Sequence, residues 1–233
     1  MKVLARCVHN IYMFRRKINS EEVFLQKTLQ RNVREGAKLL DIGCGFSRFY
    51  DIICRRGVEY VGVDVNPETV DYNRRLGRTV FLEPDLLQAT DQYDVLLLSH
   101  VIEHFDPSQL VDFLNQYLSR LREGGIVVIF TPLLHRGFYD DFDHIKPYPP
   151  AAIRQLFCKS SKQTRGFGLI GDYVELGVWF KRDSLWHTHR VGKWTHLFSL
   201  PLTVASALTY GVLGRLTGYG IVLKKSGYAG APS

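Results

Sequence analysis

The sequence contains few cysteines, and none of them are paired in a recognisable way. Four occur in 233 residues, with no C-x-x-C pair and no spacing typical of zinc ligands. This argues against a cysteine-based metal site and predicts reduced thiols in a cytoplasmic protein. Arg6 interrupts the apolar run at the N-terminus, so no secretory signal is expected. The cysteines are Cys7, Cys44, Cys54 and Cys158.

The sequence also lacks a strong excess of charge. A net charge of +7 allows an anionic partner, whether a membrane surface or RNA, without requiring one. The basic residues are spread along the chain and form no dense groove with stacking aromatics, which disfavours nucleic acid as a partner. The length and the apolar content of 45% are sufficient for one α/β domain with additional segments.

A third glycine is missing from the most informative stretch, LLDIGCG at residues 39–45. A buried strand ending at Asp41, a turn through Gly43 and Gly45, and apolar residues at helical spacing from Phe46 onward predict the first unit of a nucleotide-binding sheet. The third glycine of a dinucleotide-binding turn would stand at Arg48, and Asp41 would repel phosphates. We therefore expect a cationic ligand with an amino group, such as S-adenosylmethionine, rather than a nicotinamide cofactor.

Acidic residues also follow the next two predicted strands. Asp64 ends a strand at 59–64 and lies 23 residues beyond Asp41, near the distance at which an acid binds ribose hydroxyls in nucleotide folds. Asp85 follows a strand at 79–82, where a carboxylate can accept the adenine amino group. Three acids at three successive strand ends indicate one binding site along the carboxyl edge of a sheet.

The order DIGCG, VGVD and PDLL, followed by VIEHFDP after a predicted strand at 93–99, resembles the class I S-adenosylmethionine-dependent methyltransferases. The similarity covers roughly residues 37–157. It implies an α/β fold with a Rossmann-like, doubly wound seven-stranded sheet and S-adenosylmethionine as cofactor. Further strands are predicted at 125–132, 173–180 and 220–225. The glycine motif departs from the family's D-x-G-x-G-x-G, because Ser47 stands at its last glycine.

The resemblance implies roles for individual positions. The first acid and two glycines would hold the methionine end of the cofactor, and the acid after the second strand would bind the ribose. The remaining positions would line the adenine or border the transferring methyl group. In that order, these residues are Asp41, Gly43 and Gly45; Asp64; Val65, Asp85 and Leu86 for the adenine; and Ser99 for the methyl group.

His100, Glu103 and His104 are spaced i, i+3, i+4 after the fourth strand, and a helical turn would place them on one face. His144 lies in a D-H-x-x-P-Y segment that resembles a loop over the acceptor site in family members. Three interpretations are open: the histidines only orient the loop, His104 or His144 is the general base of an O-methyl transfer, or all four residues hold a divalent metal.

The metal alternative resembles the metal-dependent quinone-pathway O-methyltransferases and the small-RNA 3′-end 2′-O-methyltransferases, whose pattern is E-x-x-E-H. His100 replaces the first glutamate of that pattern. Between the two catalytic interpretations, we predict a base without a metal, with His104 and His144 as the catalytic residues.

Two segments lie outside the resemblance. Residues 1–36 are predicted to form an N-terminal helical extension that acts as a lid, with a helix beginning at a capping box of Asn19 and Glu22. Residues 37–233 would form the methyltransferase domain, with an apolar helical insertion at about 183–218 before the last strand. Within it, residues 194–214 contain no Lys, Arg, Asp or Glu.

That uncharged stretch is long enough to span a bilayer, but Pro201 and several hydroxyl residues interrupt it. Two interpretations stay open: a core or substrate-lid helix, or a helix that lies on a membrane surface, flanked by basic residues and tryptophans. Together these features predict O-methylation of a small-molecule, glycan or lipid-linked acceptor near the cytoplasmic membrane face, with peripheral membrane contact through 194–214. The alternatives are a metal-assisted RNA 2′-O-methyltransferase and a non-catalytic partner subunit that keeps the fold.

Overall fold

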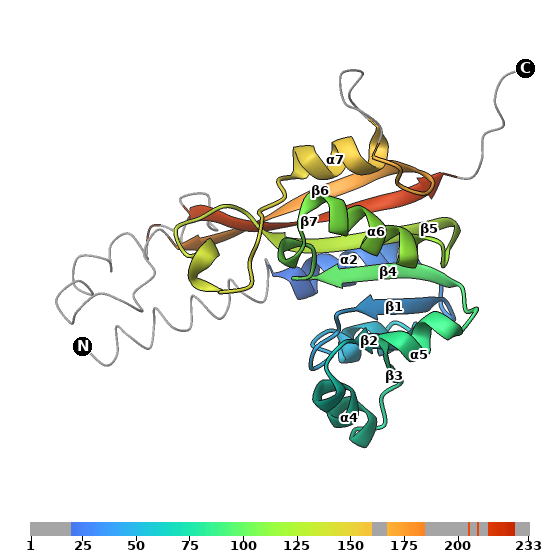
Figure 1. The fold of residues 1–233 in the computed structure, drawn as a ribbon. Coiled ribbons are helices and arrows are strands. Elements are labelled where there is room, and N and C mark those ends of the chain that lie inside the picture. Colours follow the sequence, from blue (N-terminus) through green and yellow to red (C-terminus); the bar gives the residue numbers. More distant parts are fainter. Residues whose placement is uncertain (1–19, 160–166, 185–204, 206–208, 210–213, 227–233) are drawn as a thin grey trace, which may run out of the picture.

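The fold is built on one seven-stranded sheet with the order β3-β2-β1-β4-β5-β7-β6 (Figure 1). The computed structural model describes residues 20–159, 167–184, 205, 209 and 214–226. The strands from β3 to β5 pair in parallel, and β7 runs antiparallel to both of its neighbours. The strands are β1 Lys38–Ile42, β2 Glu59–Asp64, β3 Val80–Leu82, β4 Tyr93–Ser99, β5 Leu121–Pro132, β6 Asp172–Ser184 and β7 Gly214–Ser226.

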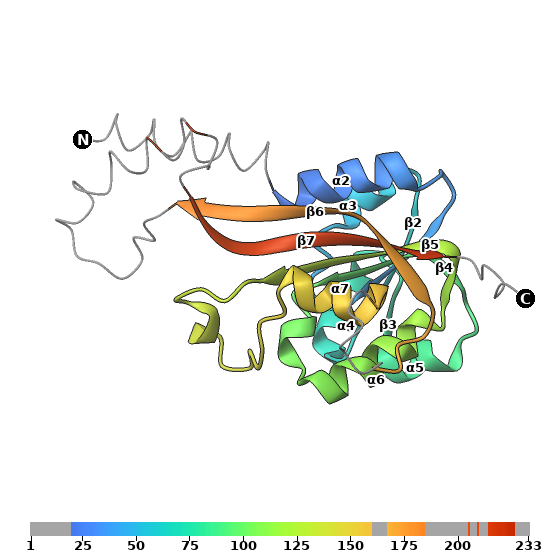
Figure 2. The same ribbon diagram turned by 90° about the horizontal axis from the view of Figure 1, so that it is seen from above.

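Helices cover both faces of the sheet, as expected for parallel strands with apolar residues on both sides. One apolar core forms between the sheet and α5, α6 and α7, and a second forms between the sheet and α2, α3 and α4. Figure 2 shows α2 and α3 on one side of the sheet, with α5 and α6 on the other. The helices are α2 Glu21–Asn32, α3 Tyr50–Cys54, α4 Pro67–Arg75, α5 Glu83–Gln88, α6 Pro107–Leu118 and α7 Pro150–Cys158, with short 3-10 turns η1 Ile102–His104 and η2 Phe138–Asp140. The predicted doubly wound seven-stranded sheet is confirmed.

The strands β6 and β7 are longer than the sequence pattern predicts. Strand β6 continues to Ser184, and β7 begins at Gly214. Pairing between β7 and β5 starts only at Gly218, which is opposite Pro132. Beyond that point the two strands form a two-stranded ribbon that projects from the sheet (Figure 2). The ends of the predicted insertion at about 183–218, which are residues 183–184 and 214–218, therefore belong to these strands.

Most of that insertion lies outside the described residues, and so does most of the uncharged stretch at 194–214. Within it, the backbone N–H of Thr209 donates to the carbonyl of Ala205 at 3.1 Å, which is the i to i−4 bond of an α-helical turn. No helix among the described residues combines the length and the apolar character needed to cross a membrane.

Two predicted helix starts need correction. The N-terminal helix α2 is capped by Ser20, whose hydroxyl accepts from the N–H of Val23, and not by Asn19, which lies with the rest of residues 1–19 outside the described part. After the glycine turn, the helix begins only at Tyr50, and Phe46 is 69% exposed. The turn continues to Phe49 before the chain can enter a regular helix.

Candidate active site

The glycine turn after β1 has the backbone that the sequence motif requires. Gly43 and Gly45 have φ angles of +65° and +51°, and a Cβ at Gly43 would lie 2.7 Å from Cγ2 of Val101. Ser47, at the position of the family's last glycine, also adopts a left-handed conformation, with φ of +53°. The departure from the motif therefore changes the side chain but not the backbone path.

A hydrogen-bond network holds Ser47 in this conformation. The hydroxyl of Tyr60 in β2 lies 2.9 Å from both Oγ of Ser47 and Oδ2 of Asp41. All three residues are buried. A non-glycine residue in the left-handed region costs about 1 kcal/mol or more, and these buried hydrogen bonds offset that cost.

We predict that Tyr60→Phe lowers the free energy of unfolding by about 1–3 kcal/mol, because it removes the hydroxyl bridge between Asp41 and Ser47. Urea denaturation would measure the change. Tyr72→Phe is the control, since Tyr72 is 45% exposed and should change stability by less than about 0.5 kcal/mol. Equal stability of the two variants would show that the bridge contributes nothing.

Asp41 carries an unusual proton affinity. Burial raises the pKa of Asp41 to about 7. The hydrogen bond from Tyr60 and the positive charge of Arg48 lower this pKa, but burial has the larger effect. A buried carboxyl group of this kind is suited to meet a cation, because a bound positive charge would favour its ionised form.

This shift predicts a pH dependence of stability. The pKa of Asp41 is raised in the folded state, so the protonated carboxyl group favours the folded protein. Its contribution to the free energy of unfolding is complete below about pH 4 and is lost as the pH rises to about 7. Relative to Asp41→Asn, the unfolding free energy of the wild type should fall by up to about 1.4 kcal/mol per pH unit over this range. Urea denaturation of both proteins at pH 5 and pH 7.5 tests this, and parallel pH profiles would contradict it.

Asp64 supports the glycine turn from the end of β2. Its carboxylate accepts from the N–H of Gly45 at 2.8 Å and from the N–H of Asn66 at 2.9 Å. The amide of Asn73 in α4 donates to the carbonyl of Gly45 at 2.8 Å, so the turn is bound on both sides. The structure thus brings the predicted ribose acid and the predicted methionine-binding glycines into direct contact.

The other predicted cofactor positions differ in accessibility. Val65 is 74% exposed just past the end of β2, and Asp85 is exposed on α5. Ser99 is partly exposed at the end of β4. Leu86, however, is 1% exposed and packs in the core, so it offers almost no surface to a ligand. The adenine roles of Val65 and Asp85 stay predictions.

The four predicted catalytic or metal-binding residues divide into two groups. His100 does not belong to the helical turn: its φ is +59°, and its ring lies between Glu21 and Glu103. Burial would lower the pKa of His100, but the neighbouring carboxylates of Glu103 and Glu21 raise it to about 9. His100 is therefore an imidazolium near neutral pH and cannot accept a proton there.

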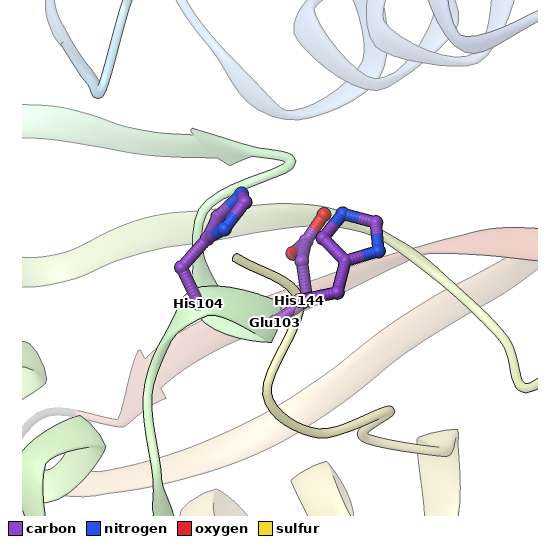
Figure 3. A group of neighbouring side chains, drawn as sticks. All are labelled: Glu103, His104 and His144. Carbon is purple, nitrogen blue, oxygen red and sulfur yellow. The ribbon is translucent and has the colours of Figure 1, made fainter. Parts of the chain in front are cut away.

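Glu103, His104 and His144 form the second group (Figure 3). One ligand-type atom from each lies within 4.8 Å of the others, and the two imidazole centroids are 5.1 Å apart. The loop that carries His144 is fixed to the η1 turn, because the N–H groups of Ile145 and Lys146 donate to the carbonyl of Glu103.

Hydrogen bonds orient both imidazoles of this group. Nδ1 of His144 lies 2.7 Å from the carbonyl of Phe138, and Nδ1 of His104 lies 3.2 Å from the carbonyl of Asp143. A carbonyl can only accept, so each Nδ1 carries a hydrogen, and in the neutral ring Nε2 then has the lone pair. Such a nitrogen can accept a proton or bind a metal.

Glu103 is fully buried, and its two oxygens differ. Oε2 accepts from the hydroxyl of Thr131 at 3.0 Å. Oε1 lies 3.3 Å from Nδ1 of His100 without a well-directed hydrogen bond and has no other partner. A buried carboxylate oxygen that accepts no hydrogen bond from the described residues, beside two oriented imidazoles, fits a divalent metal as well as a proton relay.

The fold is that of class I S-adenosylmethionine-dependent methyltransferases. The crystal structure of a SAM-dependent methyltransferase from Archaeoglobus fulgidus superposes with a TM-score of 0.60 and 20% identity, covering 92% of this chain and 99% of that one. The magnesium protoporphyrin IX methyltransferase of Synechocystis, solved with bound SAH, gives a TM-score of 0.59 at 11% identity over 88% and 82% of the two chains.

Residues 14–160 match the family model of a methyltransferase domain, which is well over half of the chain. The chain therefore belongs to this family, and the family and the solved structures indicate S-adenosylmethionine as the cofactor. It is also similar to ubiquinone biosynthesis O-methyltransferases, at 32% identity over 106 residues for Cereibacter sphaeroides and 33% over 106 residues for Aeromonas salmonicida. These matches cover 42% and 41% of this chain and span only about two fifths of the relatives' length, 42% and 43% respectively.

Two residues of the site were not found from the sequence. Tyr60 reads there as an ordinary strand residue, and only the structure shows its hydroxyl between Asp41 and Ser47. Glu21 belongs to no sequence motif, and only the structure shows whether such a glutamate at a helix start faces solvent or, as here, is buried against His100. A glutamate at the first helical position carries no signal that distinguishes these two cases.

Proposed function

We propose that the protein transfers the methyl group of S-adenosylmethionine to a hydroxyl oxygen of a small-molecule or lipid-linked acceptor. The observation that carries this proposal is the pair of oriented imidazoles, His104 and His144, beside the buried Glu103 at the carboxyl end of β4. A hydroxyl acceptor must lose a proton during transfer, and these Nε2 atoms can receive it.

The chemistry is an in-line displacement at an already activated carbon. The acceptor oxygen forms a bond to the methyl carbon, the carbon–sulfur bond breaks, and S-adenosylhomocysteine leaves with the electron pair. The acceptor proton passes to Nε2 of a histidine and then to water. The fold aligns donor and acceptor, which is the larger part of catalysis for such a donor.

The loop that carries His144 supports an apolar or lipid-linked acceptor. Four large apolar side chains in this loop are exposed: Leu134, Tyr139, Phe142 and Ile145, by 65%, 63%, 102% and 49%. Exposed apolar groups gathered beside a site suggest contact with an apolar ligand or surface. The similarity to ubiquinone biosynthesis O-methyltransferases also favours oxygen as the acceptor atom. We extend the proposal to an acceptor at the cytoplasmic membrane face, with the segment 194–214 in peripheral contact.

A metal-assisted version of the same reaction is the second candidate. Glu103, His104 and His144 would hold a divalent ion, and the observation that favours it is Oε1 of Glu103, which accepts no hydrogen bond from the described residues. Such an ion would lower the pKa of the acceptor hydroxyl, and the carbonyl contacts would orient both neutral imidazoles as ligands. An RNA 2′-O-methyltransferase would use this arrangement too.

The test is incubation with methyl-labelled S-adenosylmethionine and native cell extract, with Asp64→Ala as the control. The extract is then separated into organic-soluble, aqueous and RNA pools. Label in the organic-soluble or aqueous pool supports a small-molecule or lipid-linked acceptor. Label in RNA overturns this acceptor class, and absence of label from every pool favours a non-catalytic partner subunit.

A further inference from the structure

The N-terminal end of α2 extends to the active site and places one buried carboxylate there. Glu21 is the first residue of the helix, and its side chain is 7% exposed. It forms ion pairs with Arg48 in the turn after β1, with His100 after β4, and with Lys181 in β6. One side chain of α2 thus connects three segments that lie far apart in the sequence.

The His100 ring is held from both sides by carboxylates. Its Nε2 lies 3.2 Å from Oε1 of Glu21, and its Nδ1 lies 3.3 Å from Oε1 of Glu103. The backbone of His100 is in the left-handed region, and its N–H donates to the carbonyl of Phe130 at 2.9 Å. With the backbone fixed, the two carboxylates determine where the ring points.

We propose that Glu21 is a positioning residue for the methyl transfer: it orients His100 against Glu103 and so maintains the arrangement of Glu103, His104 and His144. This inference rests on the proposed function. Glu21 touches neither imidazole of that group, so its effect passes through His100 and the η1 turn. Helix α2 then supports the catalytic centre as well as covering the sheet.

The helix itself does not depend on Glu21. Phe24 stacks on Trp179 at 5.8 Å and meets Phe130 edge-on, while Leu25 and Leu29 are fully buried in the second core. Removing the charge at position 21 should therefore leave α2 in place and alter only the site. Glu22 provides a matched control, because it is also in the first turn and near Arg48 but is 29% exposed.

The first measurement needs no acceptor. In hydrogen exchange of the full chain, Glu21→Gln should accelerate exchange of the amides at 101–105 by about tenfold or more, because the η1 turn loses the support of His100. In Glu22→Gln, the exchange rates of the same amides should stay within about twofold of those in the wild type. Unchanged exchange at 101–105 in Glu21→Gln would overturn the proposed coupling.

The second measurement is label transfer from methyl-labelled S-adenosylmethionine to the acceptor pool. Glu21→Gln should lower kcat by about 10- to 100-fold while cofactor affinity stays within about threefold. In a His100→Asn background, Glu21→Gln should lower kcat by less than a further factor of about two, since Glu21 acts through His100. Wild-type rates in Glu21→Gln overturn the positioning role alone, whereas no label transfer by the wild type overturns the proposed function.

Discussion

Replacing Asp64 with alanine is expected to weaken binding of S-adenosylmethionine by about 100-fold. Hydrogen bonds to a charged carboxylate contribute about 1.5–3 kcal/mol each, and loss of about 3 kcal/mol corresponds to this factor. The carboxylate would bind the ribose, and it also accepts from the N–H of Gly45 in the glycine turn. Calorimetric titration with the cofactor measures the effect, with circular dichroism to check the fold.

Two further variants make this prediction specific. Asp71→Ala removes an exposed acid from the neighbouring α4 and should leave affinity within about twofold. Asp64→Asn keeps an oxygen that can accept a hydrogen bond from the N–H of Gly45. Its affinity for the cofactor should therefore lie between those of the wild type and Asp64→Ala. If Asp64→Ala bound the cofactor within about threefold of the wild type, the ribose role would be wrong.

The second large effect is expected at His144. Replacing it with glutamine should reduce the rate of methyl transfer by about 10²- to 10⁴-fold, the range typical of a lost general base, with cofactor affinity nearly unchanged. Its Nδ1–H is held by the Phe138 carbonyl at 2.7 Å, which directs Nε2 as the base. His104→Gln should reduce the rate of methyl transfer less than His144→Gln does, since the His104 ring is held by a longer contact of 3.2 Å. Rates are measured with labelled cofactor and the acceptor pool.

His135→Gln changes a histidine in the segment that leads into the same loop and is the matched control. Addition of EDTA separates the two catalytic interpretations. Under the base interpretation, the wild-type rate is unaffected by EDTA and Glu103→Gln retains part of the activity. Loss of activity in EDTA that returns with added divalent ion would instead favour the metal-assisted version, and a fully active His144→Gln would contradict both.

The sheet was predictable because its signals are local. Runs of apolar residues ending in Asp41 and Asp64 mark strand ends, and β2 and β4 begin and end where the pattern predicts. The lengths of β6 and β7 were not predictable in this way. Their outer parts pair with each other, not with the buried sheet, so the sequence there lacks the apolar pattern of a core strand.

The site was predictable only in part, because its decisive contacts are long-range. The i, i+3, i+4 spacing correctly grouped Glu103 with His104, but it placed His100 on the same helical face, whereas the left-handed backbone of His100 turns its ring toward Glu21. That contact joins residues 79 positions apart. Likewise, the motif departure at Ser47 can be understood only with Tyr60, which is supplied by another strand.

The outer parts of β6 and β7 hold together the two ends of the segment that connects these strands. Ser184 and Gly214 are paired neighbours in the ladder, so the segment between them leaves and re-enters the fold at points only about 5 Å apart. Its attachment is therefore independent of its length and content, and the glycine turn with its acids lies on other strands. Exchange of that segment would therefore leave in place the strands that carry the glycine turn and its acids.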